Sequence, residues 1–301
     1  MSATLKHISV CICTYKRPDC LRRLLLELSR QETLGLFTFS IVVADNDHTE
    51  SARRAVEEFA CSSKIPVKYC VQPEQNIALT RNSAVNNADG DYVAFIDDDE
   101  FPANLWLATL FQACEESGVE GVLGPVKRYF DAQPPNWLLK GDFYERPYYP
   151  TGTILQWSKG RTGNLLFRRE IVAGEEQPFR PEFRAGEDQD FFRRMIGRGY
   201  RFIWCADAVA FEVVPPSRWK IHIMLRRALL RGATAIVHPT FGARDVLKSI
   251  GAVPAYAVAL PFALLFGQHR MVKLLVSMFD HVGKLLALIG LNPVQEQYVI
   301  D

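Results

Sequence analysis

The chain has 301 residues, 48% of them hydrophobic, which is enough for one large core without the help of disulfides or a structural metal. Its 35 basic and 34 acidic residues leave a net charge of +1, without the basic excess of a nucleic-acid-binding protein, so we expect no nucleic-acid partner. Seven cysteines with no C-x-x-C spacing favour reduced, buried thiols in a cytosolic protein over structural zinc.

The first 130 residues alternate between apolar, β-branched runs and segments with the helical period. Such alternation predicts βαβ units, an α/β fold class and a largely parallel sheet, with the ligand outside the carboxyl ends of the strands. The expected strands are 7–13, 37–46, 67–72, 91–99 and 119–130, and the expected helices are 17–31, 50–60, 78–88 and 103–114.

The second half of the chain is less regular. Residues 131–160 are rich in Pro and aromatic side chains and predict a long, ordered loop that faces substrate. We expect a first domain over 1–214 and a C-terminal region of amphipathic and apolar helices over 215–301. The expected elements are a strand at 162–169, an acidic loop feeding a helix at 186–199, one or two strands at 200–214, and helices at 215–232, 242–266 and 268–291.

The segment "AFIDDDEFP", residues 94–102, places four consecutive acids at the end of an apolar strand. Blocks of like charge normally lie in solvated segments, so either this is a solvated strand end or a positive group belongs there. Oxygen ligands suit Mg²⁺ or Mn²⁺, and such a cation commonly neutralises a phosphate or diphosphate. The D-x-D spacing of Asp97 and Asp99 therefore predicts a metal site.

Three other phosphate-binding patterns are missing. An acidic Walker B strand needs the partner G-x-x-x-x-G-K-[ST], which the sequence lacks. A dinucleotide-binding fold needs G-x-G-x-x-G after the first strand, where this chain reads "TYKRPDC". A nucleotidyltransferase would also need a Gly-rich loop there. The sequence thus favours a metal and a nucleotide diphosphate held without a Gly-rich loop.

Several segments in order resemble the inverting glycosyltransferases of family 2, which have the GT-A fold. They are "SVCICTYKRPDCLRRLLLEL", "IVVADN", "NIALTRNSAVNNADGDYVAFIDDDEFP", "TGNLLFRR" and "GEDQDFFRRMIGRGYRF", within residues 7–214. The resemblance implies a Rossmann-like, mostly parallel mixed sheet flanked by helices. It also implies a nucleotide-diphosphate sugar as donor, a UDP-sugar being favoured, with Mn²⁺ or Mg²⁺ as cofactor and a carboxylate base.

The resemblance also implies roles for individual residues. Asp45 corresponds to the acid that contacts uracil, and Arg81 to a basic residue near the diphosphate. Asp99 corresponds to the direct metal ligand, with Asp97 on the ribose or metal side. Glu212 stands where many members have a His that contacts metal or phosphate. The residues implied to bind the nucleotide sugar are Thr14, Arg17, Asp45, Arg81, Asp97 and Asp98.

Asp188, with Glu187 beside it, corresponds to the catalytic base. Transfer with inversion needs one carboxylate to accept the proton of the acceptor hydroxyl, and Asp188 is suited to that task. Each candidate also has a structural interpretation. Glu187 and Asp188 suit a helix start, Asp45 suits a turn, and Arg81 suits an exposed helix face.

The C-terminal region suggests a membrane surface. Residues 252–267 carry no charge, but they are shorter than a spanning helix and contain Pro254 and Pro261. Basic residues mix with large apolar ones over 215–232, which fits a helix on the core or one in an anionic interface. The N-terminus lacks the pattern of a secretory signal. We expect a peripheral protein on the cytoplasmic face of the inner membrane, acting on a glycan or lipid-linked acceptor. The alternative is a catalytically silent scaffold that binds a nucleotide sugar.

Overall fold

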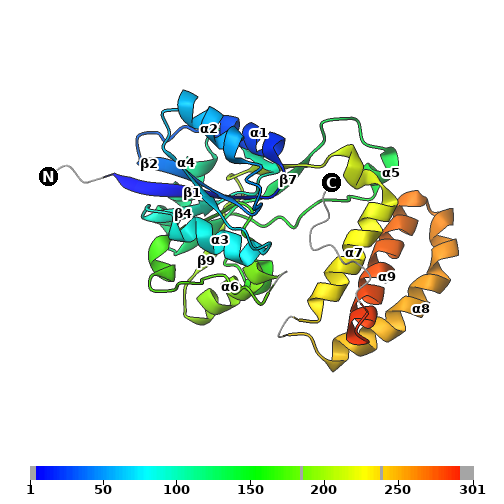
Figure 1. The fold of residues 1–301 in the computed structure, drawn as a ribbon. Helices are drawn as coiled ribbons and strands as arrows, with labels where there is room; N and C mark the ends of the chain where they lie inside the picture. The colour runs from blue at the N-terminus through cyan, green and yellow to red at the C-terminus, as the bar shows by residue number, and fades with distance from the viewer. Residues whose placement is uncertain (1–4, 184–185, 238–239, 292–301) are drawn as a thin grey trace. The chain divides into compact units, whose positions relative to one another are not determined.

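The computed structural model describes residues 5–183, 186–237 and 240–291 (Figure 1). The chain divides into two compact units, one made of Met1–Lys127 and Arg146–Glu212, the other of Arg128–Glu145 and Val213–Asp301. Residues 128–145, expected to belong to the first domain, thus belong with the C-terminal helices. The polypeptide crosses between the units three times.

The first unit contains a seven-stranded sheet in the order β3-β2-β1-β4-β8-β6-β9. Strands β3, β2, β1 and β4 are parallel, and β6 is parallel to β9, whereas β8 is antiparallel to both of its neighbours. The expected α/β class with a mostly parallel mixed sheet is confirmed. The strands are β1 (Lys6–Thr14), β2 (Phe37–Asp45), β3 (Val67–Val71), β4 (Tyr92–Phe95), β6 (Gly121–Leu123), β8 (Leu165–Arg168) and β9 (Phe202–Trp204).

Helices cover both faces of this sheet, and a second, three-stranded sheet has the order β5-β10-β7. Its strands are β5 (Glu100–Pro102), β10 (Ala210–Val213) and β7 (Val126–Tyr129). The helices of the first unit are α1 (Pro18–Leu28), α2 (Arg53–Ser62), α3 (Ile77–Asn86), α4 (Trp106–Ser117) and α6 (Glu187–Gly197), with short 3₁₀ turns η1 (Trp157–Lys159) and η2 (Arg169–Val172).

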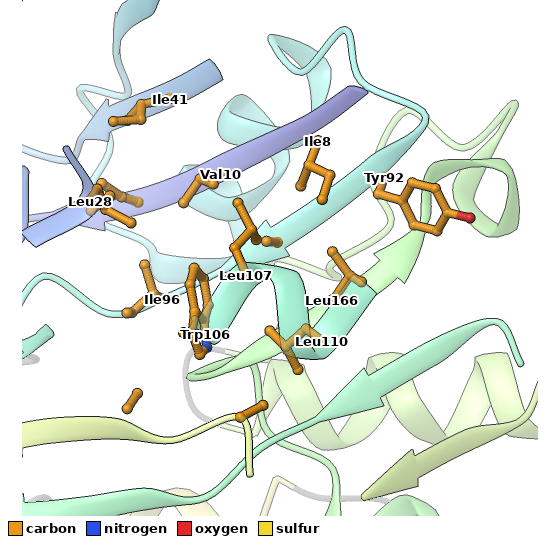
Figure 2. Packing of buried hydrophobic residues seen from close by; sticks show 14 of the residues in the cluster. Ile8, Val10, Leu28, Ile41, Tyr92, Ile96, Trp106, Leu107, Leu110 and Leu166 are labelled. Atoms are coloured by element: carbon orange, nitrogen blue, oxygen red, sulfur yellow. The ribbon is translucent and has the colours of Figure 1, made fainter. Parts of the chain in front are cut away.

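Alternation along β1 explains the two cores. Successive side chains of a strand point to opposite faces, so Ile8, Val10 and Ile12 pack with α1, α2 and α4. Cys11 points the other way and packs with α3 and α6. Figure 2 shows the first core, where Trp106 and Leu107 of α4 lie against strand residues. Burying these apolar faces fixes the strands whose ends carry the candidate site.

Two expected strands are shorter than predicted. The strand expected at 91–99 ends at Phe95, so the first three acids lie in a turn and Glu100 begins β5. The strand expected at 119–130 divides at Gly124 and Pro125 into β6 and β7. A Cβ at Gly124 would clash with the carbonyl of Ala208, and proline has no N–H for a strand ladder.

The second unit is built on three helices, α7 (Ile221–Ala235), α8 (Ala243–Leu265) and α9 (Gln268–Leu288), with α5 (Asn136–Lys140) and η3 (Pro216–Trp219). Gly232 of α7 and Gly283 of α9 let the two helices approach closely. A Cβ at either position would strike the backbone of the other helix. Helix α8 continues through Pro254 and Pro261, within the helix expected at 242–266. By length and composition alone, α8 is the one helix in the described part of the chain that could cross a membrane.

A candidate active site at the ends of the strands

Polar side chains gather where β1, β2 and β4 end, at one rim of the sheet. Thr14 and Asp45 are the last residues of β1 and β2 and are partners in the parallel register. Strand β4 is parallel to β1, and the acids follow it directly. Because the carboxyl ends of parallel strands meet at one edge, the sequence correctly placed these residues together.

Asp98 is held inside this rim by residues of the first strand and the loop after it. The Thr14 hydroxyl donates to Asp98 Oδ2 at 2.8 Å, and Arg17 Nη1 lies 3.3 Å from Asp98 Oδ1. The same Arg17 nitrogen lies 3.3 Å from Asp99 Oδ2. Burial and the neighbouring Asp99 raise the pKa of Asp98 to about 7, against the opposing effects of Arg17 and Thr14. Thr14, Arg17, Asp98 and Asp99 thus form one connected group.

A second group surrounds Glu100, which is 2% exposed. Glu100 and Glu212 are opposite each other on the antiparallel strands β5 and β10. Arg146 neutralises this like-charged pair, with Nη2 at 2.5 Å from Glu212 Oε2 and Nη1 at 3.9 Å from Glu100 Oε1. Burial and Asp97 nevertheless raise the pKa of Glu100 well above its usual range. Glu212, at the position where a metal-binding His was considered, is therefore engaged by Arg146.

The rim fits a hard divalent cation. Glu100 Oε1 is buried without a hydrogen-bond partner, and burial also raises the pKa of Asp97. A Cβ built on Gly163 would lie 3.0 Å from both Asp97 Oδ2 and Glu100 Oε1, so a larger residue there would crowd these oxygens. In the described ranges, no three acidic, His or Cys side chains converge as a complete metal site. Mg²⁺ typically takes only one or two carboxylates and completes its shell with water and substrate phosphates.

The start of α6 brings a carboxylate toward the same region. Arg81 and Glu187 form a buried ion pair. This pairing distinguishes Glu187 from the adjacent Asp188. Asp188 is only partly buried, and its Oδ1 accepts from the backbone N–H of Gln189 at 2.7 Å. The charge of Arg81 offsets part of the rise that burial causes in the pKa of Asp97, so the ion pair connects α6 to the acids.

Asp45 differs from the other candidates because its oxygens are occupied within the chain. Its Oδ1 accepts from the N–H of Asp47 at 3.0 Å, and its Oδ2 accepts from the N–H of Ala52 and the hydroxyl of Tyr69 at 2.9 and 2.8 Å. The side chain is fully buried. These bonds order the turn after β2. The uracil contact of Asp45 stays a prediction.

Asn164 is a residue that the sequence did not single out. Its Nδ2 donates to the carbonyls of Pro125 and Ala208 at 2.9 and 2.7 Å, and its Oδ1 accepts from Trp106 Nε1 at 2.7 Å. The backbone is left-handed at φ +60°, which Asn tolerates better than most residues. The only sequence signal was the Gly-Asn pair in "TGN". Asn164 fixes the strand that follows Gly163.

A large cavity lies at the opposite end of the strands, where β1 and β4 begin. It has a volume of about 580 Å³ and is lined by Lys6 at the start of β1 and by Tyr92 and Arg168. Lys6 pairs with Asp91 at 3.1 Å, and Arg168 pairs with Glu115 at 2.5 Å. Since ligands of open α/β sheets bind at the carboxyl ends, and these cations are already neutralised, size alone does not make this cavity the active site.

Comparison with known proteins identifies the family. The family model described as "Glycosyl transferase family 2" matches residues 9–172. The succinoglycan biosynthesis protein ExoM of Rhizobium meliloti (strain 1021) is 30% identical over 97% of this chain and 96% of its own length. Glycosyltransferase AglE of Haloferax volcanii is 23% identical over 72% of this chain and 70% of its own length.

Solved structures agree on the fold. The mannosyltransferase PcManGT of Pyrobaculum calidifontis, in complex with GDP-Man and Mn²⁺, gives a TM-score of 0.64 at 18% identity, covering 95% of this chain and 88% of that one. S. aureus TarS 1–349 in complex with UDP-GlcNAc gives 0.54 at 15% identity, covering 96% and 93%. At these identities the likeness shows the GT-A-type fold alone. The family match and the similarity to ExoM together show that this chain belongs to glycosyltransferase family 2.

Proposed function

We propose that the protein transfers a sugar from a nucleotide-diphosphate donor, with inversion, to a glycan or lipid-linked acceptor in polysaccharide or glycoconjugate biosynthesis. The observation that carries the proposal is the buried acidic rim, linked through Arg81 and Glu187 to the helix that bears Asp188. ExoM is named for succinoglycan biosynthesis, and TarS and PcManGT are named in complexes with UDP-GlcNAc and GDP-Man. A UDP-sugar is the donor we favour.

The chemistry follows from two sets of residues. Asp188 accepts the proton of the acceptor hydroxyl as that oxygen forms its bond to the anomeric carbon. The bond from this carbon to the diphosphate oxygen breaks, and the diphosphate leaves with the electron pair. A divalent cation held by Asp97 and Asp99, Mn²⁺ or Mg²⁺, would neutralise the charge of the leaving diphosphate. One carboxylate is sufficient, because direct attack needs no enzyme nucleophile.

Arg81 and Glu187 complete this assignment. A guanidinium buried beside a carboxylate keeps a fixed position, so Glu187 holds Arg81 toward Asp97 and the diphosphate. Thr14 and Arg17 hold Asp98 and line the nucleotide site. Asp188, which is outside this ion pair and partly exposed, is left as the base.

The test is release of nucleoside diphosphate from a panel of nucleotide sugars with Mn²⁺ or Mg²⁺, with membrane extract as acceptor. Asp99→Ala should lose metal-dependent release, and Asp188→Asn should lose transfer while it still binds UDP. Release of pyrophosphate instead would indicate a nucleotidyltransferase. No release from any donor would favour a catalytically silent scaffold that binds the nucleotide sugar.

We further propose that residues 1–214 carry the transferase chemistry and that 215–301 attach it to the cytoplasmic face of the inner membrane. Helix α8 exposes large apolar side chains, including Val258 (68%), Phe262 (61%) and Leu265 (81%). Such a face favours insertion into a lipid interface.

Sedimentation with anionic phosphatidylglycerol vesicles tests this attachment. Phe262→Glu with Leu265→Glu should release the protein into the supernatant. Leu34→Glu, a change at an equally exposed leucine of the first unit (56% exposed), should not. Equal sedimentation of the α8 variant and the wild type would contradict the attachment and leave the transferase assignment intact.

A further inference from the structure

A second, smaller cavity adjoins the acidic rim. It has a volume of about 90 Å³, and its lining includes Arg146 and Gly163. Arg146 faces the carboxylate of Glu100, and Gly163 lies beside the same carboxylate. This volume is well above the minimum that a single water needs, so the cavity has room for a substituent such as a carboxylate or phosphate group.

The cavity is rich in hydrogen-bond donors that lack partners. Lys159 and Arg161 line it and are exposed, and within the described residues neither side chain has an ion pair or a hydrogen bond. Trp204 also lines it, is 7% exposed, and has a buried Nε1 without a hydrogen-bond partner. A buried N–H normally finds a partner, which a bound ligand or a water can supply. In the cavity of about 580 Å³, Lys6 and Arg168 are paired with acids and Arg169 donates to the carbonyl of Ala88.

The segment that carries the two cations is fixed at both ends. A Cβ on Gly160 would clash with the ring of Phe192 on α6, so the backbone lies directly on that helix. Three residues later, Gly163 lies against Asp97 and Glu100. The backbone that carries Lys159 and Arg161 is therefore held between a contact with α6 and a contact with the acidic rim. A fixed backbone lowers the conformational freedom that is lost when the two side chains bind an anion.

We propose that Lys159, Arg161 and the Trp204 N–H form a subsite for an anionic group, carboxylate or phosphate, on the acceptor glycan. The inference rests on the proposed transferase function and names its acceptor class. This segment contacts α6, the helix that bears Asp188, which is the proposed base for the acceptor hydroxyl.

Binding of matched sugars to the full-length protein tests the subsite, with UDP and Mn²⁺ present and calorimetry as the readout. The probes are glucuronate against glucose, galacturonate against galactose, and glucose 6-phosphate against glucose. The acidic member of at least one pair should bind about tenfold more tightly, the effect of one charge-assisted hydrogen bond. The uronate and phosphate arms distinguish the two kinds of anion.

Variants then assign the preference to the named residues. Lys159→Ala with Arg161→Ala should reduce the acid-to-neutral ratio to within twofold, and Arg161→Lys should retain much of it. Trp204→Phe, which keeps a ring but removes the N–H, should lower acid binding about fivefold. Lys64→Ala, an exposed lysine far along the sequence, is the matched control and should change nothing.

Two results would overturn the subsite. These are equal binding of acidic and neutral sugars by the wild type, and an unchanged acid-to-neutral ratio in the double variant. An unchanged ratio together with a loss of UDP affinity in the double variant would assign the two cations to the donor diphosphate. Failure of the transferase proposal looks different, because the wild type would then release no nucleoside diphosphate from any donor, whichever sugar it prefers to bind.

Discussion

Replacing Asn164 is expected to be among the most destabilising single changes in the first unit. In Asn164→Ala, two buried groups lose their partner, namely Trp106 Nε1 and the carbonyl of Ala208. The carbonyl of Pro125 also loses a bond but still accepts from the N–H of Ala210 at 3.0 Å. At about 1–2 kcal/mol for each unsatisfied group, the loss is about 2–4 kcal/mol. The left-handed backbone at φ +60° adds about 1 kcal/mol for alanine. The expected total of about 3–5 kcal/mol is a large part of the stability of many domains.

Asn164→Gly separates the two contributions, because it loses the same hydrogen bonds but tolerates the backbone. It should be about 1 kcal/mol more stable than Asn164→Ala. The assay is urea unfolding followed by tryptophan fluorescence, with Asn86→Ala as control, since Asn86 is exposed and its loss should cost less than about 0.5 kcal/mol. An Asn164→Ala variant within 1 kcal/mol of wild type would refute the hydrogen-bond argument. Equal stability of the alanine and glycine variants would refute the backbone argument.

Three further predictions concern charge. Arg146→Met leaves the opposed Glu100 and Glu212 without their shared cation and should lower the free energy of unfolding in urea by about 3 kcal/mol. Adding Glu212→Gln should restore part of this loss. No restoration would mean that the two acids do not repel each other. Glu187→Ala leaves Arg81 buried without its ion-pair partner and should lower the free energy of unfolding by about 3 kcal/mol. Asp188→Asn should stay within about 0.5 kcal/mol of the wild type. The reverse order of stabilities would contradict the assigned roles. Desolvation raises the pKa of the partly buried Cys13 thiol to about 12, so at pH 8 iodoacetamide should label the exposed Cys61 first. Early labelling of Cys13, measured by mass spectrometry, would contradict the raised pKa.

Local patterns predicted much of the fold because each strand and helix of a βα unit has its own hydrophobic period in the sequence. Apolar runs followed by polar residues predicted the strands that end at Thr14 and Asp45, and the acids that follow β4. These residues share a rim because their strands are parallel, which the alternation with helices implied. The same reasoning overextended β4, because periodicity does not show where a chain leaves one sheet to join another.

The residues on the other side of the rim were not predictable from these patterns. Strand β8 runs antiparallel to β4 and β6, so the loop that precedes it, with Gly163 and Asn164, reaches the site. A search confined to residues that follow strands passes over this loop. Arg146 was missed for another reason, since its role depends on the register of Glu100 with Glu212, two residues more than a hundred positions apart.

The path of the chain between its two units matters for any attempt to shorten the protein. Deleting everything after Glu212 would remove the C-terminal helices but leave residues 128–145 behind. Leu138 and Phe143 of that segment are buried with Met224 and Val272, which such a deletion removes. The shortened chain would expose these apolar side chains in the retained part and is expected to aggregate for that reason alone. A soluble version is better sought by placing charges on α8, which leaves the covalent path and the buried partners intact.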